Sequence, residues 1–301
     1  MSAAAPLVTG LYVPGDRPDR FAKAVASAAD LVILDLEDAV RPEAKATARD
    51  AVVAWLGSAE GREASERAVL QVRVNEGSSD DLAALASLAA RAAVSRPAAA
   101  GSAAVGSDPV RPAFEVRLPK VETVDDLDRV AAALPGVPVT ALVESARGLE
   151  AAATLAAHPS VARLALGESD LASELGSRAD AVLDHARIRL LIAAKAHGLP
   201  APMLSAYPAL RDLDGLRRDT ERGRALGAEG RVAVHPSQLP VIRQVFAPAD
   251  GEVAWAHAVL TALDETGGGV ATLADGEMVD PAMRGRAEGI LARAERATDI
   301  P

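Results

Sequence analysis

The predicted fold is organised around the stretch PVTALVESARGLEAAATLAAHPSVARLALGESD, residues 138–170. Two short apolar runs, at 139–143 and 161–166, are separated by an Ala- and Leu-rich segment that favours a helix. Acidic residues follow each run, namely Glu144 directly after the first, and Glu168 and Asp170 shortly after the second. The pattern predicts a strand–helix–strand unit whose strand ends present carboxylate oxygens, the ligands that hard divalent cations prefer.

Similar apolar runs recur along the chain and alternate with helical segments. The predicted strands are 7–13, 30–38, 68–74, 114–118, 139–143, 161–166, 199–206 and 231–236. Eight strands alternating with helices predict an α/β fold, a TIM (β/α)₈ barrel that spans residues 1–248. An open doubly wound sheet is the alternative, but the chain has no GxGxxG after its first strand.

The last part of the chain, residues 249–301, is predicted to form a C-terminal helical lid segment. A helix at 252–264 is followed by the glycines 267–269, by the tight-turn pair Asp275-Gly276 and by a final helix. The stretch 95–112 is rich in Ala, Gly, Ser and Pro, so a surface loop is predicted there.

The composition of the 301 residues excludes several classes of protein. The chain has no cysteine, so zinc–thiolate sites and thiol nucleophiles are excluded, and its five histidines lack metal-ligand spacing. A net charge of −10 argues against nucleic-acid binding. No signal peptide or membrane-spanning run is present, so a cytoplasmic protein that does not bind membranes is expected.

Several charged side chains are predicted at the carboxyl ends of strands, where barrel enzymes collect their functional groups. Arg73 is a candidate clamp for a substrate carboxylate, or else part of a surface ion pair. Asp35 and Glu37 share one face by the period of a strand and Asp38 points the other way, so they are site carboxylates or partners of a nearby arginine. Arg17, Arg20 and Lys23 surround a helix start, which indicates an anion site or a solvated basic helix end.

The carboxylates Glu144 and Asp170 are predicted to hold a divalent cation. With no thiol and no clustered imidazole, a hard cation such as Mg²⁺ is favoured. Such a cation could bind a 2-oxo acid and stabilise negative charge on its oxygen while Arg73 holds the carboxylate. That arrangement is suited to making or breaking a carbon–carbon bond beside a carbonyl.

Seven motifs occur in one order, within a similarity that spans about residues 7 to 295. They read LYVPGDRPDRFAKA, LVILDLEDAV, VRVN, LPKVET, ALVESARGL, LGESDLASELG and VAVHPSQLPVIRQVFAP. Together they closely resemble the citrate lyase β-subunit-like branch of the HpcH/HpaI aldolase superfamily. The resemblance implies a trimeric or hexameric TIM barrel that binds Mg²⁺. It implies an enzyme that cleaves 3-hydroxyacyl-CoA thioesters to an acyl-CoA and a 2-oxo acid, or forms them.

The resemblance also implies roles for residues by position. The metal ligands would be Glu144 and Asp170, the substrate contact Arg73, and the residues that orient metal-bound water Glu37 and Asp38. The residues that meet the substrate or the CoA portion would be Tyr12, Arg17 and Lys23.

The tail motif GEMVDPAM, residues 276–283, resembles the lid of malyl-CoA and citramalyl-CoA lyases. The resemblance implies that Asp280 is the acid–base residue and that it reaches the active site of a neighbouring subunit. One departure concerns the family pattern DxVYxDxRD, which reads LSAYPALRD at 204–212, with Leu204 and Ala209 at the acidic positions. This departure puts the pocket floor and the acyl substrate in doubt.

The alternatives to a malyl-CoA or citramalyl-CoA lyase are a citrate lyase β subunit acting on an acyl carrier protein, and a malyl-CoA thioesterase-type enzyme.

Overall fold

The structure is a computed structural model that describes residues 7–94 and 113–298, so the loop predicted at 95–112 lies outside the described residues. The chain divides into two compact units. The first ends at Arg243 and the second begins at Gln244.

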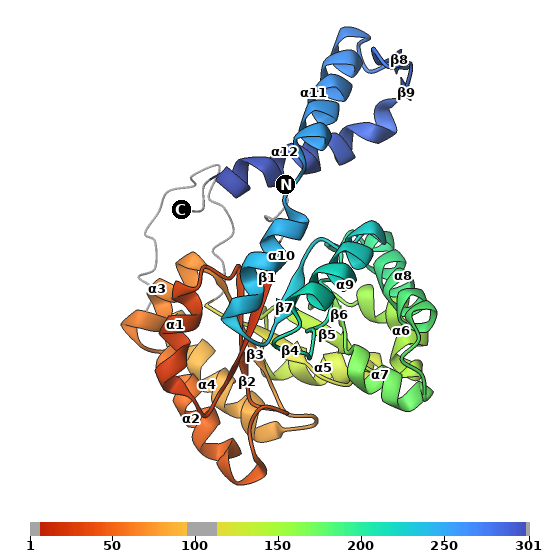
Figure 1. Ribbon diagram of the computed structural model, residues 1–301. Coiled ribbons are helices and arrows are strands. Elements are labelled where there is room, and N and C mark those ends of the chain that lie inside the picture. Colours follow the sequence, from red (N-terminus) through yellow and green to blue (C-terminus); the bar gives the residue numbers. More distant parts are fainter. Residues whose placement is uncertain (1–6, 95–112, 299–301) are drawn as a thin grey trace. The chain divides into compact units, whose positions relative to one another are not determined.

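A curled, seven-stranded parallel sheet forms the centre of the first unit, with the order β6-β5-β4-β3-β2-β1-β7 (Figure 1). The strands are β1 (Thr9–Pro14), β2 (Leu31–Asp35), β3 (Val69–Arg73), β4 (Glu115–Leu118), β5 (Val139–Val143), β6 (Val161–Leu166) and β7 (Arg231–Ala233). Their Val, Leu and Ile residues are buried, as expected where helices cover a sheet of parallel strands. Seven of the eight predicted strands are therefore confirmed.

The segment predicted as the remaining strand, 199–206, forms only an isolated parallel bridge between Leu204 and Arg231. Its other side reaches β6, because the Ser205 hydroxyl donates a hydrogen bond to the carbonyl of Leu166. The segment thus contacts both edges of the sheet without extending the backbone ladder. The predicted TIM (β/α)₈ barrel is confirmed as a curled parallel α/β sheet, not as eight paired strands.

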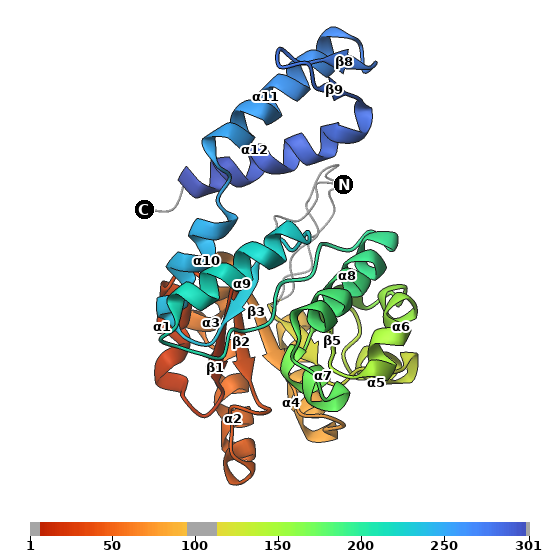
Figure 2. The same ribbon diagram turned by 45° about the vertical axis from the view of Figure 1, so that its right-hand side comes forward.

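In the described residues up to Phe246, α-helices pack around the sheet in both views (Figures 1 and 2). They are α1 (Phe21–Ala26), α2 (Lys45–Leu56), α3 (Ala59–Arg67), α4 (Ser79–Val94), α5 (Val124–Ala133), α6 (Ala146–Ala156), α7 (Glu168–Leu175), α8 (Asp180–Ala196), α9 (Leu213–Ala225) and α10 (Leu239–Phe246), the last of which contains the boundary between the units. The α2 residue Trp55 is buried and packs edge-on against Phe21, with 5.4 Å between ring centroids.

The polar stretch 173–184 is largely helical. α7 continues to Leu175 and α8 begins at Asp180, so only residues 176–179 are irregular. Leu171 and Ala172 are buried beneath the polar residues of α7, and Gly176 ends this helix with a left-handed φ of 64°. Acidic residues at the start and a glycine just past the end are helix signals that outweigh the polar composition.

The second unit is a pair of helices, α11 (Asp250–Glu265) and α12 (Arg284–Thr298), which pack along each other (Figure 2). A small antiparallel hairpin, β8 (Ala271–Thr272) and β9 (Met278–Val279), joins them and confirms the predicted turn at Asp275-Gly276. In this unit, the half-buried Trp255 donates to Glu277 at 2.8 Å. Throughout 7–94 and 113–298, no helix is long and apolar enough to cross a membrane.

Candidate active site

Glu144 follows β5 and is the most enclosed of the predicted metal ligands, with 6% of its surface exposed. Its Oε2 accepts a hydrogen bond of 3.0 Å from the backbone N–H of Lys120. Lys120 has a left-handed φ of 51°, a strained conformation at the exit of β4 that aims this N–H at the carboxylate. On the other side lies Gly167, where a Cβ atom would overlap the Glu144 side chain. Backbone from two neighbouring connections therefore forms a cradle for Glu144.

Asp170 lies in the first turn of α7, so it does not stand directly at a strand end. Its side chain is exposed, and its charge is one of the causes that raise the pKa of Glu144. A carboxylate in a first helical turn is favoured by the helix dipole. Asp170 is therefore near enough to Glu144 to influence its pKa, and the joint role of the two residues as metal ligands stays a prediction.

Arg73 at the end of β3 is surrounded by carboxylates. It bonds Asp35 through two parallel contacts of 2.7 and 2.6 Å, and its Nη1 lies 2.9 Å from Glu37 and 3.1 Å from Asp38. Burial disfavours the guanidinium charge, but the hydrogen bonds and charge of Asp35 outweigh it, so the pKa of Arg73 is raised. Asp38 was predicted to point away from Asp35 and Glu37, but β2 ends at Asp35, so the alternation of the strand does not continue to Asp38. The carboxylates of Asp35, Glu37 and Asp38 therefore all face Arg73. The ion-pair interpretation of Asp35 is thus confirmed.

Glu37 is a buried carboxylate with incomplete hydrogen bonding. Its Oε2 has no hydrogen-bond partner in the described part of the chain, although Arg73 lies close. Burial raises the pKa of Glu37 to about 7 against the attraction of Arg73. Burial, followed by the charge of Glu37, likewise raises the pKa of Glu144 to about 7.

These carboxylates fit a hard divalent cation. Burial raises the pKa of both Glu37 and Glu144, and the charge of Glu37 raises that of Glu144 further, so a cation beside Glu144 would stabilise its charged form. Across the described ranges, no group of three or more His, Asp and Glu side chains is spaced to hold a metal ion. Mg²⁺ does not need such a group, because it keeps several waters and often takes one or two protein carboxylates.

Tyr12 on β1 contacts two arginines. Its ring centroid is 5.0 Å from the guanidinium carbon of Arg73 and 5.7 Å from that of Arg117. Arg117 was not among the predicted site residues. The signal was present in the sequence, since Glu115 and Arg117 alternate with apolar residues in a predicted strand, which places both charges on one face of the sheet.

The basic residues after β1 lie at the surface. Arg17 is paired with Asp19 at 2.9 Å, and Lys23 is exposed on the short helix α1. This arrangement agrees with a solvated basic helix end. The contact of Arg17 and Lys23 with substrate or CoA stays a prediction.

Lys45 is a second residue near the site that no pattern in the sequence indicates. From α2 its ammonium group donates to the carbonyls of Leu36 and Glu37, at 2.9 and 2.7 Å, and to the Asn75 side chain at 2.5 Å. It thereby ties the turn that carries Glu37 to the connection after β3. No spacing rule links residues 45 and 75, so only the fold reveals this contact.

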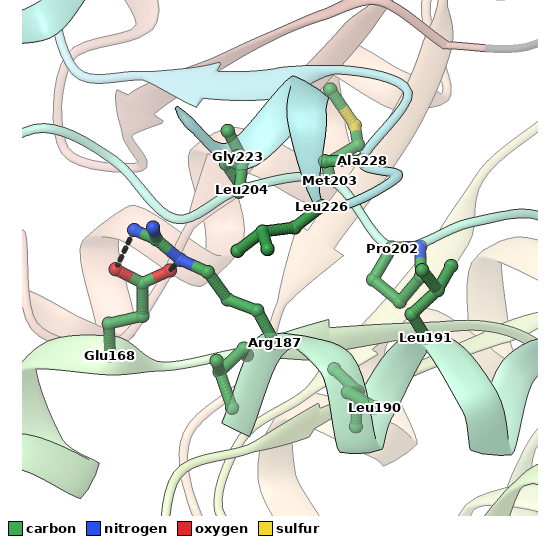
Figure 3. Close-up of a pocket in the computed structure, with 11 residues that line it drawn as sticks. Glu168, Arg187, Leu190, Leu191, Pro202, Met203, Leu204, Gly223, Leu226 and Ala228 are labelled. Atoms are coloured by element: carbon green, nitrogen blue, oxygen red, sulfur yellow. Dashed lines mark hydrogen bonds and ion pairs between the residues drawn. The ribbon is translucent and has the colours of Figure 1, made fainter. Parts of the chain in front are cut away.

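Glu168 belongs to a different group from Glu144. Both of its oxygens bond Arg187 at 2.8 Å, as the dashed lines in Figure 3 show. Beside this pair is a cavity of about 20 Å³, room for about one water. Leu204 lines the cavity with apolar residues of α8 and α9 (Figure 3). The leucine that replaces an acidic family residue therefore packs against helices, and any change of the pocket floor must come from elsewhere in 204–212.

Asp280 lies in the second unit, at the start of a short 3₁₀ helix, Pro281–Met283. Its carboxylate accepts a 2.9 Å hydrogen bond from the Ala282 backbone N–H. This contact is an ordinary helix cap. The predicted acid–base role of Asp280 stays a prediction.

The fold and the site define a class of protein, a parallel α/β enzyme with acidic and arginine side chains at the carboxyl ends of its strands. The chain belongs to the HpcH/HpaI aldolase/citrate lyase family, whose sequence model matches residues 8–96 and 80–236. The resemblance inferred from the seven motifs is thereby confirmed.

Three relatives show how far the similarity extends. A (3S)-malyl-CoA thioesterase from Cereibacter sphaeroides is 36% identical over 96% of this chain and 95% of its own length. A citrate lyase subunit beta-like protein from Mycobacterium tuberculosis is 36% identical over 96% of both chains. The structure of CitE from M. tuberculosis, in complex with magnesium, acetoacetate and coenzyme A, matches with a TM-score of 0.74 at 33% identity, over 98% of this chain and 100% of that one.

Proposed function

We propose that the protein is a Mg²⁺-dependent carbon–carbon lyase that cleaves or forms a 3-hydroxyacyl-CoA of the malyl-CoA or citramalyl-CoA type. The observation that carries this proposal is Glu144, a buried carboxylate held by Lys120 N–H in a space that Gly167 leaves open. The family to which the chain belongs supports carbon–carbon bond chemistry. The CitE complex supports magnesium and CoA as ligands.

In this proposal Glu144 and Asp170 hold Mg²⁺. When bound, the cation supplies Lewis-acid stabilisation of negative charge on the oxygen of the 2-oxo acid. Glu37 and Asp38 orient water molecules around it. The substrate contacts Tyr12, Arg17 and Lys23. The positive charges of Arg17 and Lys23 suit the phosphates of CoA.

The proposed cleavage begins when Asp280, contributed by a neighbouring subunit, takes the proton of the 3-hydroxyl group. The bond between carbons 2 and 3 of the acyl chain breaks, the 3-carbon becomes the carbonyl of the 2-oxo acid, and the electron pair passes to the thioester as an enolate. Protonation of that enolate on carbon 2 gives the acyl-CoA. Arg73 holds the carboxylate of the 2-oxo acid throughout.

The wider architecture is also part of the proposal. The segment 199–206 stands in for the eighth strand of a (β/α)₈ barrel, because it contacts both edges of the sheet. The assembly is a homotrimer or hexamer, and light scattering on the purified protein distinguishes these from a monomer.

The experiment is a product analysis with Mg²⁺ and either malyl-CoA or citramalyl-CoA. Acetyl-CoA with glyoxylate or pyruvate is the result expected for a lyase. Glu144→Gln should abolish turnover, whereas Glu150→Gln, a matched change on the exposed face of α6, should not. Absence of any CoA product would favour the citrate lyase β-subunit alternative, with an acyl carrier protein as substrate.

A malyl-CoA thioesterase is the second candidate, supported by the relative from C. sphaeroides. It differs in the bond that breaks, because hydrolysis of the thioester releases free CoA and malate. The same product analysis therefore decides between the two. Free CoA without acetyl-CoA would overturn the lyase assignment.

A further inference from the structure

Arg187 on α8 is a buried arginine that contacts the first residue of α7. Only 6% of its side chain and 12% of the Glu168 side chain are exposed. Its Nε and Nη2 atoms donate to the two oxygens of Glu168, both at 2.8 Å. Two parallel hydrogen bonds between charged groups fix the relative orientation of the side chains. They therefore also restrict how the two helices lie against each other.

Glu168 faces apolar surroundings where it borders the small cavity. Besides Glu168 and Arg187, the cavity of about 20 Å³ is lined by apolar residues such as Leu166, Leu190 and Leu204 (Figure 3). A carboxylate against apolar side chains is costly without a charged partner. Loss of Arg187 would therefore turn Glu168 toward solvent, and the first turn of α7 would move with it.

Arg187 is itself held by ion pairs that reach β7. It bonds Asp184 on its own helix at 3.1 Å and Asp219 on α9 at 3.3 Å. Asp219 also accepts from Arg231 on β7, whose Nε donates to the carbonyl of Ser205 at 3.0 Å. These contacts connect β7 to α8 at the edge of the sheet where regular strand pairing is missing. Arg187 is thus a fixed point against which α7 is placed.

The first turn of α7 carries groups that belong to the candidate metal site. Gly167, directly before Glu168, leaves the space that the Glu144 side chain occupies. Asp170 comes two residues after Glu168, so the two side chains leave the helix about 200° apart. A contact that holds Glu168 on one side of α7 therefore sets the direction of Asp170 on the opposite side.

We propose that Arg187 is a positioning residue for the metal site, which holds Glu168 and thereby fixes the rotation of α7 about its axis. The inference rests on the proposed function, in which Glu144 and Asp170 hold Mg²⁺. In this role Arg187 touches neither the cation nor the substrate. It keeps Asp170 turned toward the space beside Glu144. Groups that orient a metal ligand in this way strongly affect the affinity of a site for its metal.

The competing interpretation is that the pair of Glu168 and Arg187 only stabilises the fold, while the buried Leu171 and Ala172 hold α7 by themselves. Either role would lower the melting temperature when Arg187 is replaced, so stability does not separate them. The affinity for Mg²⁺ does, because charge alone acts in the opposite direction. Removal of a cation near two carboxylates would strengthen binding of a divalent cation, whereas a displaced Asp170 would weaken it.

The test is isothermal titration calorimetry of the chelator-treated, full-length protein with Mg²⁺ alone. Arg187→Met should weaken Mg²⁺ binding about tenfold, although it removes a positive charge. Arg187→Lys keeps the charge but loses the planar two-pronged contact with Glu168, so the affinity should fall about threefold. Arg189→Met is the matched control, because Arg189 lies on the same helix and bonds both oxygens of the exposed Glu150. This variant should bind Mg²⁺ as the wild type does.

A double variant shows whether Arg187 acts through Asp170. The Arg187→Met change should weaken Mg²⁺ binding no further in a protein that already carries Asp170→Asn, because a misplaced ligand and an absent ligand lose the same contact. A full additional loss of about tenfold would show that Arg187 acts on another part of the molecule, and would contradict the inference.

Two further results would overturn the inference. One is an Arg187→Met protein with a native circular dichroism spectrum that binds Mg²⁺ as tightly as the wild type, or more tightly. If that variant does not fold, Arg187→Lys decides, and wild-type affinity in it is the second result. A wild type that does not bind Mg²⁺ would overturn the proposed function as well, whereas Mg²⁺ binding that is equal in all folded variants of Arg187 refutes the role of Arg187 alone.

Discussion

Gly167 has a steric role that no larger residue can fill. A Cβ atom at this position would overlap the side chain of Glu144. Its φ of −94° is open to alanine, so Gly167→Ala should fold but displace the carboxylate. We expect Mg²⁺-dependent turnover to fall by about 100-fold, as for a misplaced catalytic group.

Gly251→Ala is the matched control for this prediction. Gly251 lies in α11 with nothing within 4 Å of an added Cβ. That variant should keep full activity in the product assay. Equal activity of the two variants would show that Glu144 does not need its observed position.

The raised pKa values of Glu37 and Glu144 predict how stability depends on pH. Each folded-state pKa is about 7, above the ordinary value near 4.5, so protonation favours the folded state of the metal-free protein. This contribution is complete below about pH 4.5 and is lost as the pH rises through about 7. In chelator-treated protein, the melting temperature should therefore fall from about pH 5 to about pH 8.

Added Mg²⁺ should reverse that trend, because protons and the cation compete for the same carboxylates. The Mg²⁺-induced rise in melting temperature should be larger at about pH 8 than at about pH 5. Glu144→Gln should lose most of both effects. A Mg²⁺ effect that is the same in this variant would exclude Glu144 as a ligand.

Single residues also show what the sequence could reveal. Glu144 was found because an acid ends an apolar run, and the structure places it where that pattern predicts. The cradle of Lys120 N–H and Gly167 was not predictable, since one contact depends on a left-handed backbone angle and the other on empty space. Arg117 could not be assigned in the same way, because the alternation of a strand indicates the face of a charged residue but not its contact with Tyr12.

At the scale of elements, α2 positions the turn after β2 through Lys45. Lys45→Met removes three hydrogen bonds, two of them to the carbonyls of Leu36 and Glu37. Unfolding in urea should show a loss of about 1–3 kcal/mol, and activity should fall as Glu37 becomes less ordered. Arg41→Met removes an exposed ion pair from the same region and should change stability by less than about 0.5 kcal/mol. Loss of stability with full activity would show that Lys45 has no part in positioning Glu37.

The apolar pattern predicted seven strands correctly, but the eighth predicted strand does not pair regularly, for a physical reason. The segment 199–206 contains Pro200 and Pro202, which have no backbone N–H to donate to a ladder. A single bridge at Leu204 and the side chain of Ser205 therefore replace regular pairing. Periodicity detects which faces are apolar, but it does not detect how many backbone hydrogen bonds a segment can make.

At the scale of the whole molecule, the prediction concerns Asp280 in the second unit. If Asp280 is the acid–base residue, Asp280→Asn should lower turnover by about 100- to 10,000-fold and leave Mg²⁺ binding unchanged. Asp275→Asn, a change in the turn of the same hairpin, should have little effect. Full activity of Asp280→Asn would remove this residue from the mechanism.

The structure divides the chain into two units between Arg243 and Gln244. Each unit contains one of the two tryptophans of the protein, Trp55 in the first and Trp255 in the second. Their surroundings differ, since Trp55 is buried against Phe21 and Trp255 is half-buried beside Glu277. The fluorescence of a Trp255→Phe protein would therefore report only on the α/β unit, and that of Trp55→Phe only on the helical unit. The chain thus carries its own optical labels, with which the movement and melting of each unit can be followed separately without attaching a dye.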